Sequence, residues 1–183
     1  GLVSSDGTPL RQSALGVDVG RGGNFTVLAP RYGNLVPELY RDHTPNVMHV
    51  VGLVMMHRHD SRAVVDVIGL GAGAVDRLRE LDIPVLGFNA GRHTDATDVS
   101  GELGFVNLRS AGWWNLRELL DPSSGSEITL PPDDRLTGDL TAPTWKVPSG
   151  KIVVESKDTI FERLKRSTDD GDAVMMAFTS PEM

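Results

Sequence analysis

The sequence contains no cysteine among its 183 residues. Disulfide frameworks, zinc sites built from thiolates and cysteine nucleophiles are therefore all excluded. Basic residues are the minority: 18 Lys and Arg stand against 25 Asp and Glu, which gives a formal net charge of −7. This balance argues against a protein that coats nucleic acid by charge alone, although a divalent metal bound by acidic residues would reverse the local sign.

Long apolar runs are lacking too. The stretch Val47–Met56 is interrupted by His49 and Gly52 and is too short to span a bilayer. No basic-then-apolar signal segment opens the sequence, so we expect a cytoplasmic protein. No G-x-x-x-x-G-K-[ST] phosphate loop occurs, so the chain is not predicted to be an ATPase itself. With 39% hydrophobic and 23% charged residues, one globular domain is expected.

The order of the expected elements predicts a mixed α/β domain. Short β-rich runs near 14–19, 25–29 and 35–40, with a glycine-rich turn at 20–24, predict an antiparallel meander. Helices over 45–57 and 71–82 alternate with strands over 63–68 and 85–88, and crossover helices imply parallel pairing. We expect further helices over 109–120, after residue 156 and over 169–178, and a strand at 152–154. Residues 1–13 are expected to be a linker, 14–183 the domain, and the Pro- and Gly-rich stretch near 130–152 a hairpin insertion.

Aspartates occupy unusual positions in this pattern. Asp18 lies on the first expected strand, and Asp66 lies inside the β-branched run AVVDVI. Asp169 and Asp172 open the last expected helix, where a spacing of three places them on one face. An unpaired carboxylate in an apolar strand costs several kcal/mol, roughly, unless a partner offsets it. A divalent ion held by the cluster would do so, and hard oxygen ligands suit Mg²⁺ or Mn²⁺.

Several motifs in the same order as these aspartates carry a family resemblance. GVDVG at 16–20, an aspartate in a later apolar strand and an aspartate at the start of a C-terminal helix resemble the ribonuclease H-like nucleases. VDVIG at 65–69, NLRSAGWWNLR at 107–117, VESKD at 154–158 and RSTDDGDAV at 166–174 are more closely similar to the C-terminal nuclease domain of a tailed-bacteriophage terminase large subunit. The resemblance spans residues 14–178.

The resemblance implies a metal-dependent endonuclease that cleaves double-stranded DNA during viral genome packaging. Asp18, Asp66 and Asp172 match the metal-binding acidic triad, and Asp169 matches an additional acidic position. Two ions about 3.5–4 Å apart can activate a water and stabilise the leaving oxygen of a phosphodiester, with Asp18 as the natural bridging ligand. The family often has Pro and Ala where this chain has Thr168 and Gly171, so the choice between Asp169 and Asp172 as the direct ligand stays open.

Partners follow from the same resemblance. The implied partners are double-stranded DNA, an N-terminal packaging ATPase domain, a portal protein and a small terminase subunit. The implied location is the cytoplasm of a host cell, and no membrane is an expected partner. Duplex binding needs basic residues near the acidic centre, and Lys157, Arg166, Lys146 and Lys151 are the candidates. Each could equally belong to a solvated surface.

Other readings stay open beside this one. Another ribonuclease H-like enzyme, such as a Holliday-junction resolvase or a transposase core, would share the acidic triad, and a binding module could keep the fold without catalysis. Residues 69–74 match the dinucleotide pattern G-x-G-x-x-A, but Asn89 stands near the position where that site needs an acidic residue. The run HRHD at 57–60 has no obvious third metal ligand, which favours a surface loop.

Overall fold

The computed structural model describes residues 2–3, 6–20, 24–44, 46–180 and 182. The elements follow the order β1 (Ala14–Asp18), β2 (Thr26–Arg31), β3 (Tyr40–Asp42), α1 (Val47–His57), β4 (Arg62–Asp66), α2 (Leu70–Glu80), β5 (Val85–Phe88), β6 (Gly104–Phe105), α3 (Leu108–Leu120), α4 (Asp134–Leu140), β7 (Trp145–Lys146), β8 (Lys151–Val154), α5 (Lys157–Leu164) and α6 (Asp169–Ala177). Short 3-10 turns lie at Pro122–Ser124 and Pro148–Gly150.

A five-stranded sheet in the order β3-β2-β1-β4-β5 forms the centre of the molecule. β1 pairs with β2 and β2 with β3 in antiparallel fashion, whereas β1 pairs with β4 and β4 with β5 in parallel. The parallel pairs need crossover connections, and α2 supplies the one between β4 and β5. This confirms the predicted mixed α/β sheet, an antiparallel meander followed by parallel strands.

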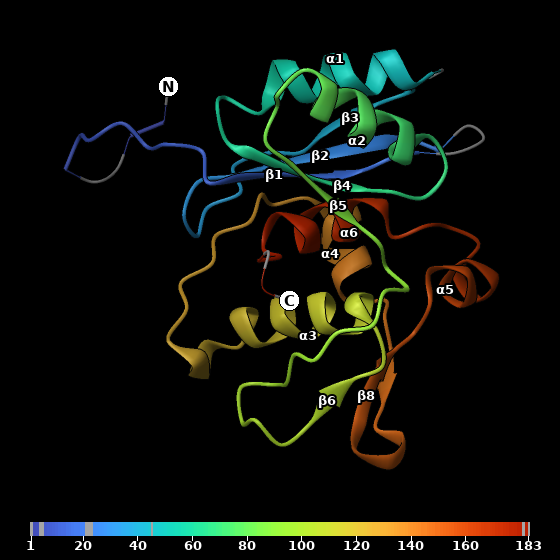
Figure 1. Ribbon diagram of the computed structural model, residues 1–183. Coiled ribbons are helices and arrows are strands. Elements are labelled where there is room, and N and C mark those ends of the chain that lie inside the picture. The colour runs from blue at the N-terminus through green and yellow to red at the C-terminus, as the bar shows by residue number, and fades with distance from the viewer. Residues whose placement is uncertain (1, 4–5, 21–23, 45, 181, 183) are drawn as a thin grey trace.

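Helices cover both faces of this sheet (Figure 1). α1 and α2 lie on one face, where Leu15, Val17 and Val65 pack against Val50 and Leu78 in one hydrophobic core. α6 lies on the opposite face, with α4 and α3 beyond it, and a second core forms there. α6 is thus enclosed between the sheet and other helices, which explains why each of its residues is buried.

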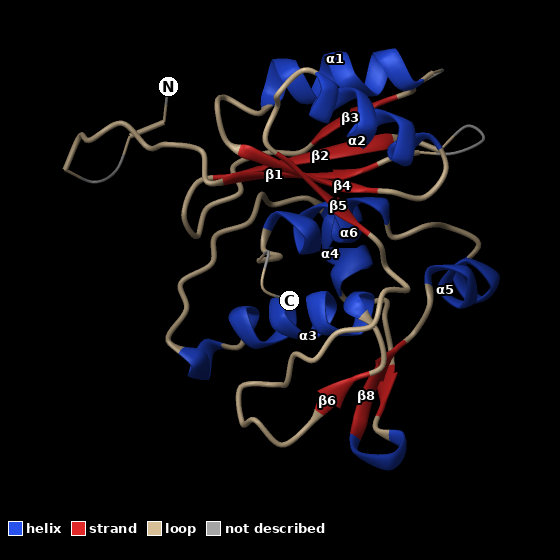
Figure 2. Cartoon of the chain, in the orientation of Figure 1, coloured by secondary structure: helices blue, strands red, loops and turns tan. Residues whose placement is uncertain are grey.

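A second sheet of three short strands, in the order β6-β8-β7, lies at the far end of the molecule from α1 (Figure 2). It corrects the expectation of a hairpin insertion over 130–152. The hairpin is narrower, since it consists of β7 and β8, and α4 occupies Asp134–Leu140 within the same stretch. The sequence pattern missed α4 because the helix has only seven residues and includes Gly138. Asp133 caps it by accepting hydrogen bonds from the Arg135 and Leu136 amides.

The third strand of the meander also lies later than expected. The apolar run at 35–40 predicted it, whereas β3 is Tyr40–Asp42. Val36 is fully buried and its amide donates to the Thr129 carbonyl, so the start of this run forms an isolated β-bridge with a distant segment and no strand of the five-stranded sheet. The glycine-rich turn expected at 20–24 falls largely on residues 21–23, which lie outside the described residues.

The glycines at the start of α2 have a packing explanation. Gly69 has a φ of 68°, in the region that favours glycine. A Cβ on Gly71 would come within 1.7 Å of the Asp66 carbonyl oxygen, so this turn of α2 lies directly on the end of β4. In the described part of the chain, no helix combines the length and the apolar character needed to cross a membrane.

Candidate metal centre

Asp18 and Asp66 end two neighbouring parallel strands. Successive side chains of a strand point to opposite faces of the sheet. Val17 of β1 and Val65 of β4 pack toward α1 and α2, so the aspartates that follow them point to the other face, toward α6. The register pairs Val17 with Val65, and the two carboxylates therefore lie at matching carboxyl ends of adjacent strands. Asp66 also accepts a hydrogen bond from the Ile68 amide at 3.1 Å.

Asp169 and Asp172 come from the first turn of α6. The amino end of a helix carries a partial positive charge that favours carboxylates. A Cβ on Gly16 would lie 2.0 Å from the Ala173 carbonyl oxygen, so the backbone of α6 rests directly on β1. The missing side chain at Gly16 therefore allows α6 to bring its carboxylates next to Asp18, two residues further along the same face of β1.

A cavity of about 570 Å³ lies where these strand ends meet α5 and α6. The charged residues of its lining are Asp18, Asp66, Asp158, Asp169, Asp172, Arg109 and Lys157. These are five carboxylates and two cations, which leaves a formal excess of three negative charges. The structure thus brings together all four aspartates that the sequence singled out.

Lys157 places its ammonium among three of the carboxylates. Its Nζ lies 3.0 and 2.9 Å from the two carboxylate oxygens of Asp18, 3.0 Å from Asp169 Oδ1 and 3.4 Å from Asp172 Oδ2. Ser156 caps α5 and so fixes Lys157 at its first helical position. Burial acts to lower the pKa of Lys157, but the surrounding carboxylates, Asp18 foremost, outweigh it and raise this pKa. The side chain is therefore an ammonium at neutral pH.

Asp172 is held by neighbours from two elements. Arg109 and Trp113 of α3 both donate to its Oδ1, the indole Nε1 at 2.9 Å, and Thr168 donates to its Oδ2 at 2.9 Å. Burial acts to raise the pKa of Asp172, but Arg109 and then Lys157 outweigh it and lower this pKa to about 2. Asp172 is therefore ionised and fixed in orientation.

The residues of the cavity fit a divalent cation. Burial raises the pKa of Asp18 well above its ordinary value, and the Lys157 ammonium opposes that rise. A further cation near Asp18 would favour its ionised form. Within the described ranges, no three His, Asp or Glu side chains form a ready-made metal-binding group; the Lys157 ammonium lies among the carboxylates instead. The excess of negative charge in the cavity favours a divalent cation, and carboxylate oxygens are the hard donors that Mg²⁺ and Mn²⁺ prefer.

The other basic candidates lie away from the cavity lining. Arg166 pairs with Asp139 of α4. Lys146 and Lys151 are exposed on the β7–β8 hairpin. Of the basic residues that the sequence singled out for DNA, Lys157 is the one that the described cavity lining includes.

Sequence reasoning missed Arg109 and Trp113 as partners of Asp172. The two are separated from Asp172 by 63 and 59 positions, so no local pattern connects them. A weak signal was present. Arg109 lies four positions before Trp113 and seven before Leu116, so it shares a helix face with two apolar residues that predict burial. Asp158 was missed for a different reason, since an acidic residue in the first turn of a helix is ordinary.

No family model and no curated protein matches the sequence. Solved structures do match the fold. The nuclease domain of the large terminase subunit gp2 of bacterial virus Sf6 is similar with a TM-score of 0.76 and 18% identity, over 96% of this chain and 91% of that one. A mutant of that domain with manganese and beta-thujaplicinol gives a TM-score of 0.75 at 17% identity, over 94% and 90%.

A second phage provides a more distant match. The large terminase nuclease of thermophilic phage G20c, with bound magnesium, gives a TM-score of 0.61 at 14% identity, over 90% of this chain and 78% of that one. The similarity to both phage proteins covers 90% or more of this chain. This chain therefore has the ribonuclease H-like fold of phage large terminase nuclease domains.

Proposed function

We propose that this chain is a metal-dependent DNA endonuclease of a viral genome-packaging machine. One observation carries the proposal: four aspartates from β1, β4 and α6 converge on one cavity in a fold shared with terminase nuclease domains. Solved structures with that fold include forms with manganese, calcium, magnesium or cobalt, which supports divalent-metal use here.

Six of the seven charged residues of the cavity lining, all except Asp158, have a role in this proposal. Asp18, Asp66 and Asp172, with Asp169 beside them, would hold Mg²⁺ or Mn²⁺, as two ions. When bound, the metal supplies an activated water and charge stabilisation for the cleaved phosphodiester. Lys157 keeps the carboxylates together by neutralising part of their charge. Arg109 and Trp113 hold Asp172 in its ionised, oriented form.

We assign double-stranded DNA as the substrate. The exposed Lys146 and Lys151 on the β7–β8 hairpin are the candidates for phosphate contacts, and Arg166 and Lys157 remain candidates nearer the cavity. The partners we propose are a packaging ATPase domain, a portal protein and a small terminase subunit, in the cytoplasm of the host cell.

The direct test is cleavage of supercoiled plasmid with Mn²⁺, with Mg²⁺ or with EDTA. We expect nicking and linearisation with either metal, none with EDTA, and loss of cleavage in Asp66→Asn by about 100-fold or more, since the amide removes a charged ligand. The matched control is Asp76→Asn on α2, whose side chain is 75% exposed and which we expect to cleave like the wild type.

Two results would decide against the proposal. No cleavage, together with no Mn²⁺ binding in calorimetry, contradicts a metal-dependent nuclease. Preference for a four-way DNA junction over plasmid by a large factor would favour a junction-resolving enzyme of the same fold instead of a packaging nuclease.

A further inference from the structure

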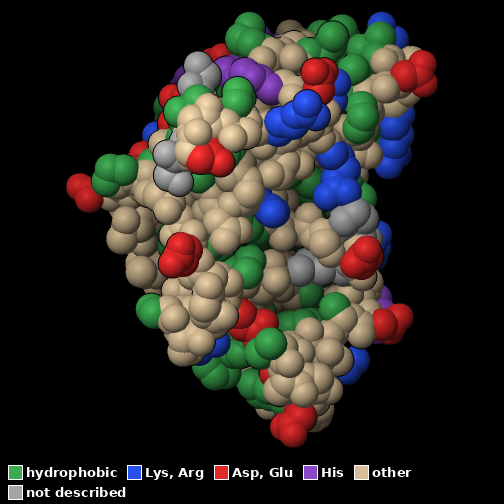
Figure 3. All heavy atoms as spheres, turned by 90° about the vertical axis from the view of Figure 1, so that its left-hand side faces the viewer, with side chains coloured by type: hydrophobic (Ala, Val, Ile, Leu, Met, Phe, Trp, Pro, Cys, Tyr) green, Lys and Arg blue, Asp and Glu red, His purple; other side chains and the backbone are tan. Residues whose placement is uncertain are grey.

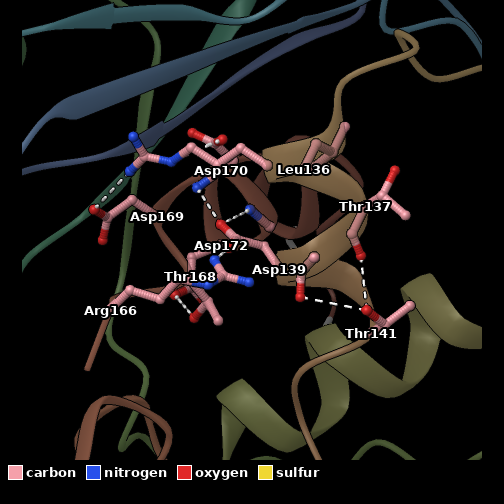
Figure 4. A network of polar contacts seen from close by, with 12 residues as sticks. Leu136, Thr137, Asp139, Thr141, Arg166, Thr168, Asp169, Asp170 and Asp172 are labelled. Atoms are coloured by element: carbon pink, nitrogen blue, oxygen red, sulfur yellow. Dashed lines mark hydrogen bonds and ion pairs between the residues drawn. The ribbon is translucent and has the colours of Figure 1, made fainter. Parts of the chain in front are cut away.

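The first turn of α6 is fixed by a carboxylate that lies outside the cavity. Asp139 of α4 is fully buried. Its Oδ2 accepts hydrogen bonds from the Asp170 amide at 3.0 Å and from the Gly171 amide at 3.3 Å. Figure 4 shows Asp139 beside the beginning of α6, close to Thr168 and Asp170. A side chain from another helix therefore caps the amides that a helix leaves unpaired at its amino end.

The same carboxylate also holds the chain that leads into α6. Its Oδ1 pairs with the Arg166 guanidinium, and Arg166 lies three residues before the helix begins. The Arg166 side chain is 40% exposed, whereas Asp139 has no exposed surface. One buried group is thus bonded both to the approach segment and to the first turn.

Gly171 limits how this turn can move. A Cβ at Gly171 would lie 2.7 Å from Trp113 Cη2 and 3.1 Å from Asp139 Cβ. The turn is therefore packed between α3 and α4 with no room for a methyl group. On the far side of the turn, Asp170 is buried and pairs with Arg41 at 2.8 Å.

We propose that Asp139 is a positioning residue, which fixes the first turn of α6 and thereby the direction in which Asp169 and Asp172 face the cavity. The deduction rests on the proposed metal-dependent function. Asp170 and Gly171 lie between the two cavity aspartates, and each residue of an α-helix turns the side-chain direction by about 100°. A small rotation of this turn therefore moves both carboxylates. Asp139 is absent from the described cavity lining, so it acts through the backbone of α6.

Variants of Asp139 separate positioning from general stability. Asp139→Asn keeps an oxygen that can accept from the two amides, whereas Asp139→Ala removes it. Asp139→Ala also leaves Arg166 without its partner. A double variant, Asp139→Ala with Arg166→Ala, therefore tests the loss of the cap without leaving an unpaired charge. The single variant Arg166→Ala is the reference for this double variant. Asn46→Ala is the matched control, because it removes an N-cap from α1 on the opposite face of the sheet.

Two readouts are needed, one of them independent of metal. The indole N–H of Trp113 donates to Asp172, so its signal in a ¹H–¹⁵N spectrum without added metal reports the position of that carboxylate. Trp114→Phe and Trp145→Phe assign the other two indole signals. Mn²⁺ affinity is measured by calorimetry well below the unfolding temperature of each variant.

We expect the alanine variants to shift the Trp113 signal and to weaken Mn²⁺ binding by about tenfold or more, the usual effect of losing a group that orients metal ligands. Asp139→Asn and Asn46→Ala should leave both readouts close to the wild type, and Arg166→Ala should shift them less than the double variant does. An unchanged Trp113 signal in the double variant, relative to Arg166→Ala, overturns the positioning role. Wild-type protein that binds no Mn²⁺ would instead contradict the proposed function, and the metal-free spectrum would still decide the role of Asp139.

Discussion

Lys157 is the cation that lies among three of the cavity carboxylates. Its ammonium lies within 3.4 Å of Asp18, Asp169 and Asp172, and its side chain is 33% exposed. Without this ammonium, less of the negative charge on the three buried carboxylates would be neutralised. A divalent ion bound at the same carboxylates would supply that compensation in another form, so the lysine and the metal act on the same charges.

Replacing Lys157 with alanine should therefore separate stability from metal response. In EDTA we expect unfolding free energy to fall by about 3 kcal/mol, the low end for breaking a buried ion pair, because the lysine is partly exposed. Added Mn²⁺ should raise the unfolding temperature of Lys157→Ala by more than that of the wild type, since ligand binding stabilises the folded state. Urea unfolding and thermal melts with and without Mn²⁺ make both measurements.

Lys165→Ala is the control for that variant, because Lys165 follows α5 but is absent from the described cavity lining. It should change neither the stability in EDTA nor the response to Mn²⁺. A Lys157→Ala protein as stable as the wild type in EDTA would show that the carboxylates do not need its charge.

The contact between β1 and α6 depends on a glycine with no room for a side chain. A Cβ at Gly16 would lie 2.0 Å from the Ala173 carbonyl oxygen and 2.5 Å from the Ala177 amide nitrogen. Both are backbone atoms, so neither can turn away. The helix that carries two of the cavity aspartates can approach the strand that carries Asp18 only because this position has no Cβ.

Alanine at two glycines should therefore have opposite effects. Gly16→Ala should destabilise the protein by about 3 kcal/mol or more, the upper end for overpacking a core. Gly52→Ala on α1 meets nothing within 4 Å and should stabilise by about 0.5–1 kcal/mol through helix propensity. Chemical denaturation of the two variants and the wild type provides the comparison. Equal stability of Gly16→Ala and the wild type would contradict the close packing of α6 on β1.

The sequence predicted the elements that carry the aspartates, because each has a strong local signal. β4 is a continuous β-branched run, and α6 begins with acidic residues followed by apolar ones. These signals place Asp66 and Asp172 correctly on their elements. α4 was missed because it has only seven residues, includes Gly138, and packs on α6, a contact that its own residues do not reveal.

The partners of the carboxylates were less predictable. Lys157 was interpreted as a group for DNA, and nothing in VESKD indicates that its ammonium reaches Asp18, 139 positions earlier. Asp139 lies in the stretch near 130–152 that is expected to be a hairpin insertion, yet it is fully buried. Such contacts follow from the topology that brings α4, α5 and α6 to the end of β1, and a single sequence carries no record of them.

The molecule as a whole is acidic, and its charges are mixed on the surface. On the face shown in Figure 3, acidic and basic side chains are interspersed. A formal charge of −7 repels a polyanion at long range. We therefore expect this chain alone to bind DNA weakly, through a few contacts with phosphates.

Salt dependence of DNA binding tests those contacts. The slope of log association constant against log salt should decrease in magnitude by up to about 2 when Lys146 and Lys151 are both changed to glutamine, since each phosphate contact contributes about one. The measurement uses fluorescence anisotropy with a duplex and Asp66→Asn protein, which we expect to bind DNA without cleaving it. Arg77→Gln with Arg79→Gln on α2 is the control pair, and an equal decrease there would contradict a contact specific to the hairpin.

The packing of α6 on β1 also orders events during synthesis of the chain. Asp18 and Asp66 leave the ribosome before Lys157, Asp169 and Asp172, which follow them by about 90 residues or more. Pairing between such distant segments forms late in folding. An incomplete chain therefore has only two of the four cavity aspartates Asp18, Asp66, Asp169 and Asp172 in place, so the proposed metal site can form only after α6 has been synthesised.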